Sequence, residues 1–139
     1  MDRLLFALFA LSLSASATAE WVKIGENDLG AFFIDPDTIR PQGNFRKVWA
    51  LTDMKKFVIE GARSYRVQWE YDCSEKRSRV LYLSAYSRKL ATGKMLFSTA
   101  GPQTWEPTPP DTPDALIREI VCSTGNSARI FSTRLAPRP

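Results

Sequence analysis

Apolar and polar side chains alternate along much of the segment from residue 21 to residue 98, and this period of two constrains the fold more than any other feature. Successive side chains of a strand point to opposite faces, so such alternation is typical of a strand with one buried face. The clearest run is Tyr65, Arg66, Val67, Gln68, Trp69, Glu70 and Tyr71. The pattern predicts a sheet with one face packed and one face toward solvent.

Turn-prone residues divide this region into five or six short strands, at residues 21–25, 31–34, 45–52, 64–72, 79–86 and 94–98. We expect the second strand to end at Asp35-Pro36-Asp37-Thr38, because proline has no amide hydrogen for a ladder. In residues 45–52, one face should carry Phe45, Lys47, Trp49 and Leu51. In residues 79–86, Leu81, Leu83 and Ala85 should lie opposite Val80, Tyr82 and Tyr86. Short sequential strands favour an antiparallel meander.

A single helix is predicted near the end of this region. Four prolines between residues 102 and 110 disfavour both helix and ladder bonding. Thr112 then fits the N-cap position, Pro113 the first helical position, and Asp114 the positive end of the helix dipole. The following apolar residues form one face of the helix: Leu116, Ile117, Ile120 and Val121. This helix is expected to cover one face of the sheet.

Cys73 and Cys122 are the only cysteines, and an even pair in an exported chain is most simply one disulfide. It would tie the end of the helix to the end of a strand. Closing a 49-residue loop contributes about 4 kcal/mol in the chain-entropy description of disulfides. A redox-active or metal-binding pair is the competing interpretation, but it requires closely spaced thiols or added ligands.

Residues 1–19 resemble a signal peptide. Arg3 precedes an apolar run from Leu4 to Leu13, and Ala17-Thr18-Ala19 has the small-x-small pattern of a cleavage site. We expect cleavage after Ala19, a mature domain over residues 20–122, and a basic, flexible tail over residues 123–139. The alternative is an N-terminal helix retained as an anchor or core element. No other segment approaches the length of a transmembrane helix.

The composition argues against an enzyme. Histidine is absent, which excludes Ser-His-Asp and Cys-His mechanisms and any imidazole-based zinc site. Asp35 and Asp37 are better explained by a turn than by calcium binding, and the glycines form no phosphate loop. We expect neither catalytic residues, nor a metal, nor a cofactor. The net charge of +4 and the pI of about 9.3 favour anionic partners, while export argues against nucleic acid.

The candidate binding surface consists of one aromatic and two basic pairs: Trp105, Lys76, Arg77, Arg88 and Lys89. Trp105 stands in the proline-rich loop, where it is either an anchor for the loop or an exposed contact. Solvated turns also explain the basic pairs. A binding role requires these residues to converge in space.

Several segments between residues 21 and 122 are notable for their order along the chain: Trp21-Val22-Lys23-Ile24, Phe33-Ile34-Asp35-Pro36-Asp37-Thr38-Ile39, Val48-Trp49-Ala50-Leu51-Thr52-Asp53, Tyr71-Asp72-Cys73, Tyr86-Ser87, Trp105-Glu106-Pro107-Thr108-Pro109-Pro110 and Cys122. Together they give the chain a resemblance to the surface-adhesin protein E family of exported Gram-negative proteins. It implies an α+β fold, with a curved antiparallel sheet of five to six strands, one C-terminal helix packed on it, and one disulfide. It also implies adhesion to host proteins such as vitronectin and laminin.

These observations lead to two hypotheses about function. The first is an exported, non-enzymatic, adhesin-like domain that contacts a host matrix or serum protein, an envelope protein, or a glycosaminoglycan. The second is a periplasmic accessory protein without a host ligand, which the absence of a lipidation cysteine near the cleavage point favours. Unpaired edge strands also leave a homodimer by sheet pairing open.

Overall fold

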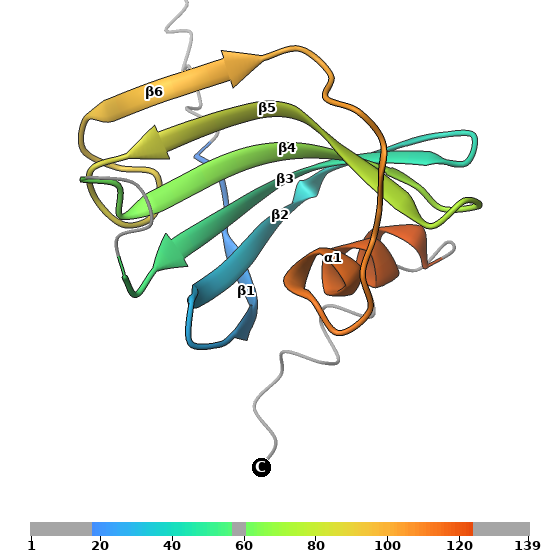
Figure 1. Cartoon of the computed structure of the whole chain (residues 1–139), viewed down its shortest axis with the longest axis horizontal. Helices are drawn as coiled ribbons and strands as arrows, with labels where there is room; N and C mark the ends of the chain where they lie inside the picture. The colour runs from blue at the N-terminus through green and yellow to red at the C-terminus, as the bar shows by residue number, and fades with distance from the viewer. Residues whose placement is uncertain (1–17, 57–60, 124–139) are drawn as a thin grey trace, which may run out of the picture.

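The computed structural model describes residues 18–56 and 61–123 and shows one antiparallel sheet followed by one helix (Figure 1). Six strands pair in sequence order: β1 (Val22–Glu26), β2 (Gly30–Gln42), β3 (Phe45–Met54), β4 (Ser64–Asp72), β5 (Arg77–Tyr86) and β6 (Met95–Ala100). The two-residue strand β7 (Glu106–Pro107) pairs with the start of β5, and α1 (Pro113–Cys122) ends the domain. The predicted α+β fold is confirmed, and β7 is an addition that the sequence did not indicate.

The second strand does not end at Pro36, contrary to the prediction. β2 continues to Gln42, with an irregularity in its pairing to β3 between Asp35 and Arg40. Within this bulge the Trp49 amide donates to the Thr38 hydroxyl at 2.9 Å. A side-chain oxygen thus accepts the hydrogen bond that a backbone carbonyl accepts in a regular ladder. Proline is tolerated at such a bulge because the ladder is already interrupted there.

The face assignment within β5 also needs a correction. Tyr82 pairs with Gln68 while Val80 pairs with Trp69, so Leu81 is an extra residue in the ladder. This bulge places Val80 on the same face as Leu83 and Ala85 rather than opposite them. Period-two counting could not detect the bulge, since every residue near it is compatible with a strand.

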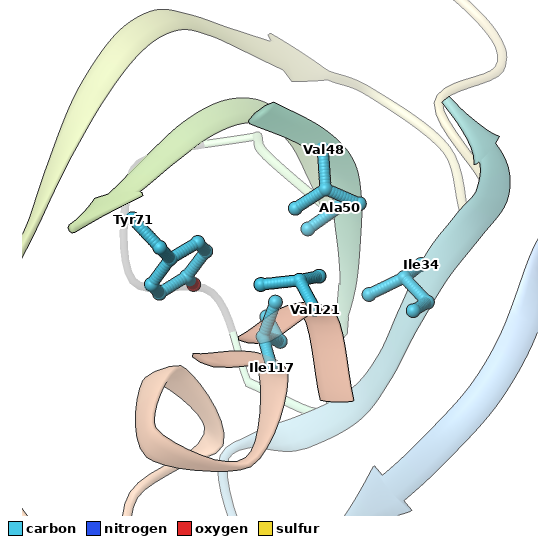
Figure 2. Close-up of a cluster of buried hydrophobic side chains, with 6 residues drawn as sticks. All are labelled: Ile34, Val48, Ala50, Tyr71, Ile117 and Val121. Atoms are coloured by element: carbon cyan, nitrogen blue, oxygen red, sulfur yellow. The ribbon is translucent and has the colours of Figure 1, made fainter. Parts of the chain in front are cut away.

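The helix packs on one face of the sheet and completes the hydrophobic core (Figure 2). The buried members of this core come from three strands and from α1: Ile34, Val48, Ala50, Tyr71, Ile117 and Val121. Tyr71 donates a hydrogen bond to the carboxylate of Asp114 at 2.6 Å, and Ser78 donates to the same carboxylate at 2.9 Å. Burial, together with the neighbouring Asp114 charge, raises the pKa of Tyr71 well above its usual range.

The predicted disulfide joins the helix to the sheet. Cys73 follows β4, Cys122 is the last residue of α1, and their Cα atoms lie 5.6 Å apart. The bond therefore closes the helix onto the strand that contributes Tyr71 to the core.

The N-cap of α1 is Thr112, as the sequence predicted. Its hydroxyl accepts a hydrogen bond from the Ala115 amide at 3.1 Å. We expect Thr112→Ala to lower the free energy of unfolding by about 1 kcal/mol, because this amide loses its acceptor. Urea denaturation measures the effect, and Thr112→Ser, which keeps a hydroxyl, is the matched control. Equal stability of the alanine variant and the native protein would contradict this role.

Two further predictions fall outside the residues that the structure describes. Almost all of the expected signal peptide lies in residues 1–17, and nearly all of the expected basic tail lies in residues 124–139. Within residues 18–56 and 61–123, no helix is long and apolar enough to cross a membrane.

Candidate binding surface

We call the sheet face opposite α1 the outer face. Tyr71 points toward the helix, so its neighbours in the alternating pattern of β4 point away: Arg66, Gln68, Glu70 and Asp72. Their pairing partners on β3 lie on the same face, and they include Phe45 and Trp49. No described helix or strand packs across the outer face.

Trp105 is fixed at one end of the outer face. Its ring lies 5.7 Å from the ring of Phe45, centroid to centroid. The guanidinium carbons of Arg77 and Arg79 lie 4.9 Å and 4.4 Å from the centroid of the indole. We call these four residues the Trp105 cluster. Trp105 therefore anchors the proline-rich loop to the sheet, yet its side chain stays partly exposed.

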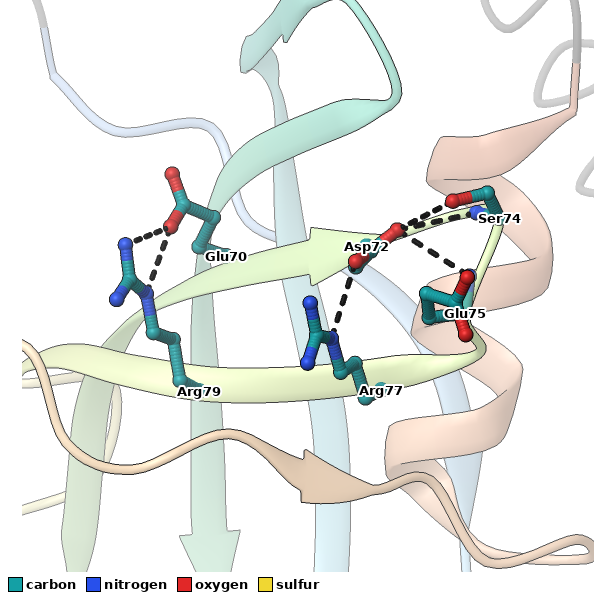
Figure 3. Close-up of polar contacts among 6 residues, drawn as sticks. All are labelled: Glu70, Asp72, Ser74, Glu75, Arg77 and Arg79. Atoms are coloured by element: carbon teal, nitrogen blue, oxygen red, sulfur yellow. Dashed lines mark hydrogen bonds and ion pairs between the residues drawn. The ribbon is translucent and has the colours of Figure 1, made fainter.

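Two carboxylates hold the arginines of the Trp105 cluster in place (Figure 3). Glu70 accepts from Arg79 at 2.6 Å and 2.8 Å, and Asp72 accepts from Arg77 at 3.0 Å. Both carboxylates are almost fully buried. Each guanidinium is thus fixed by an ion pair and a cation–π contact, and its positive charge is balanced within the domain.

Asp72 has a second role at the turn between β4 and β5. Its burial, taken alone, raises the pKa, but hydrogen bonds from Ser74, the Glu75 amide and Arg77 outweigh this effect and lower the pKa of Asp72. A carboxyl group with a lowered pKa stabilises the fold above its unfolded-state pKa, and this stabilisation is lost as the pH falls through the folded-state value.

We therefore expect Asp72→Asn to be less stable than the native domain at pH 7, with a difference that shrinks as the pH falls below about 4. Urea denaturation of both proteins between pH 7 and pH 2 measures the difference between their free energies of unfolding. Contributions from the other carboxylates cancel in this difference because both proteins contain them. A difference that stays constant over this range would show that the Asp72 charge does not contribute to stability.

A second aromatic cluster lies further along the outer face. Trp49 and Tyr82 meet edge to face at 5.6 Å, and the Arg66 guanidinium carbon lies 4.0 Å from the centroid of a Trp49 ring. We call these three residues the Trp49 cluster. Sequence reasoning assigned Trp49 to a strand face but did not connect it with Arg66, because the two residues belong to different strands.

The candidate residues from the sequence do not all converge. Arg77 and Trp105 come together, and Lys76 is exposed in the adjacent turn. Arg88 and Lys89 follow the other end of β5, about 30 Å away at the usual rise of a strand. The loop that carries them is held by Ser64, whose hydroxyl donates to the Arg88 carbonyl and accepts from the Ala91 amide. The two basic pairs thus lie at opposite ends of the sheet.

No group of three or more cysteine, aspartate or glutamate side chains in residues 18–56 and 61–123 could hold a metal ion. The paired carboxylates Glu70 and Asp72 are both occupied by arginines. The outer face instead carries aromatic and arginine side chains, which are residue types enriched at protein interfaces.

Comparison with known proteins identifies the family. The chain belongs to the surface-adhesin protein E family, whose family model matches residues 21–123. The family consists of non-enzymatic binding proteins. No individual curated protein matches the sequence.

The fold matches solved structures of protein E from Haemophilus influenzae. Crystal form II of that protein aligns with a TM-score of 0.60 and 17% identity, covering 76% of this chain and 88% of the other. Protein E from non-typeable Haemophilus influenzae aligns with a TM-score of 0.54 and 17% identity, covering 88% of both chains. At 17% identity the likeness to these structures concerns the fold alone. The family match over residues 21–123 confirms the resemblance found in the sequence.

Proposed function

We propose that this protein is an exported, adhesin-type domain that binds a host matrix or serum protein through its outer face. The observation that carries the proposal is the Trp105 cluster. It places a partly exposed tryptophan against two fixed arginines, on a face across which no described helix or strand packs. Tryptophan and arginine are the residue types most enriched where protein interfaces derive their binding energy.

The rigidity of the cluster supports this role. Ordering a long side chain at an interface costs about 0.5–1.5 kcal/mol, and Arg77 and Arg79 are already ordered by Asp72 and Glu70. Their charges are also balanced, so covering the cluster would not leave unpaired guanidinium groups in a dry interface. A partner would meet a preorganised surface.

Location is the first test of this proposal. The signal peptide is proposed to be cleaved after Ala19 and the mature domain to reach the cell surface. Intact cells are treated with protease, and the mature domain is then detected with an antibody. Loss of the signal with an intact envelope supports adhesion. Protection until the outer membrane is broken would contradict it and favour the periplasmic accessory role.

Binding through the Trp105 cluster is the second test. Surface plasmon resonance with immobilised vitronectin and laminin compares the native domain with Trp105→Ala. We expect the substitution to weaken binding at least tenfold, as for a central aromatic in an interface. Lys94→Ala, a change at an exposed site after β5, is the control and should bind as the native domain does. Equal binding by all three proteins would overturn the outer-face assignment.

A further inference from the structure

Arg66 differs from the other arginines that stack on tryptophan. Arg77 and Arg79 each have a carboxylate partner, whereas Arg66 forms no ion pair with any residue in the described part of the chain. Its Nε–H is buried and has no acceptor there. A buried N–H without an acceptor is costly, and the guanidinium has no counter-charge in the described residues, so the position favours a partner from outside the chain.

The side chains around Arg66 suit an incoming carboxylate. Gln68, which is half-buried, is the next residue along β4 that faces outward, whereas Ser84, opposite Arg66 on β5, is fully buried and donates its hydroxyl to the Tyr86 oxygen. Trp49 fixes the guanidinium plane from one side. The nearest outer-face acids already have partners: Glu70 accepts from Arg79, Asp53 from the Leu90 amide, and Asp35, beside Trp49, from the Asp37 amide. The Gln68 amide therefore lies beside a single unbalanced positive charge.

The charge balance of the three stacked arginines distinguishes a polyanionic ligand from a ligand with a single carboxylate. A sulfated glycosaminoglycan carries several negative charges along its chain, but Asp72 and Glu70 already balance the charge of two of the three stacked arginines. A protein surface can instead present one carboxylate flanked by apolar groups. Such a group would pair with Arg66 while its neighbours contact Trp49 and Tyr82.

We propose that the Trp49 cluster is a binding site for one aspartate or glutamate side chain of a partner protein, with Arg66 as the residue that pairs with it. The inference rests on the proposed function and specifies which group of the partner is recognised. Arginine is suited to this role because its planar donors match a carboxylate. The stacking on Trp49 holds that plane in position before the partner arrives.

The test uses two capped pentapeptides as probes. One has the sequence Ala-Phe-Glu-Phe-Ala, and its twin has glutamine in place of glutamate. Each is titrated into nitrogen-15-labelled protein while the Nε–H signal of Arg66 is followed by NMR. We expect a saturable shift with the glutamate peptide and at least tenfold weaker binding of the glutamine twin. Equal responses to the two peptides would overturn the proposal.

Two variants and one competitor complete the design. Arg66→Gln should abolish the response, whereas Arg46→Gln, an equivalent change on the helix side of β3, should preserve it. Thermal melts establish that both variants fold. Stronger binding of a heparin oligosaccharide, with a steep salt dependence, would contradict the single-carboxylate site.

The experiment separates this inference from the proposed function. If vitronectin or laminin binds the native domain and Arg66→Gln equally well, the carboxylate site is wrong while the outer-face proposal stands. If the glutamate peptide binds through Arg66 but neither host protein binds, the site stands and host adhesion is wrong.

Discussion

Cys73→Ser is expected to lower the melting temperature of the domain by about 15–20 °C. The disulfide closes a loop of 49 residues. Its loss gives the unfolded chain more conformational entropy, which lowers the free energy of unfolding by about 4 kcal/mol in the chain-entropy description. For a domain of about 100 residues, each kilocalorie corresponds to about 4–5 °C. The bond also fixes the end of α1, whose residues Ile117 and Val121 complete the core.

Differential scanning calorimetry of the native and variant domains measures this effect. Cys122→Ser and the double variant should melt at the same temperature as Cys73→Ser, because each removes the same bond. A native sample kept in reducing agent is the matched control and should show a similar loss. An unchanged melting temperature in these samples would contradict a disulfide that stabilises the core.

Tyr71→Ala is expected to lower the free energy of unfolding by about 3–5 kcal/mol. Tyr71 is fully buried between the sheet and α1, so truncation leaves a cavity and removes most of the contacts of its ring. It also removes the hydrogen bond to Asp114, which links β4 to the first turn of the helix. Urea denaturation at pH 7 measures the change.

Tyr71→Phe separates these two contributions. It keeps the ring in the core and deletes only the hydroxyl, while Asp114 keeps its hydrogen bond from Ser78. We expect a loss of about 2 kcal/mol, as for a hydrogen bond to a charged group. If the phenylalanine and alanine variants were equally stable, ring packing would not be the main contribution of Tyr71.

Most of the fold follows from local patterns in the sequence. Alternation predicted the strands, Thr112-Pro113-Asp114 predicted the start of the helix, and two cysteines fixed its attachment to β4. The errors arose where the ladder is irregular. Both Pro36 and Leu81 lie at bulges, which depend on pairing with the neighbouring strand rather than on the residues of one strand.

The candidate site was less predictable than the fold. Trp105 and Arg77 were identified from their local context, but their contact depends on β7 pairing with the start of β5. The Arg66–Trp49 contact joins two strands and required the register between β3 and β4. Arg88 and Lys89 look equivalent to Lys76 and Arg77 in sequence, yet the two pairs lie at opposite ends of β5.

Hydroxyl-radical footprinting of the tryptophans, with and without bound vitronectin or laminin, tests the outer face most directly. Trp49 and Trp105 lie on the outer face, while Trp69 packs against the core on the helix side. Mass spectrometry measures the oxidation of each tryptophan separately. We expect the partner to protect Trp105 and Trp49 and to leave the oxidation of Trp69 unchanged. Protection of Trp69 alone, with the other two still reactive, would contradict binding through the outer face.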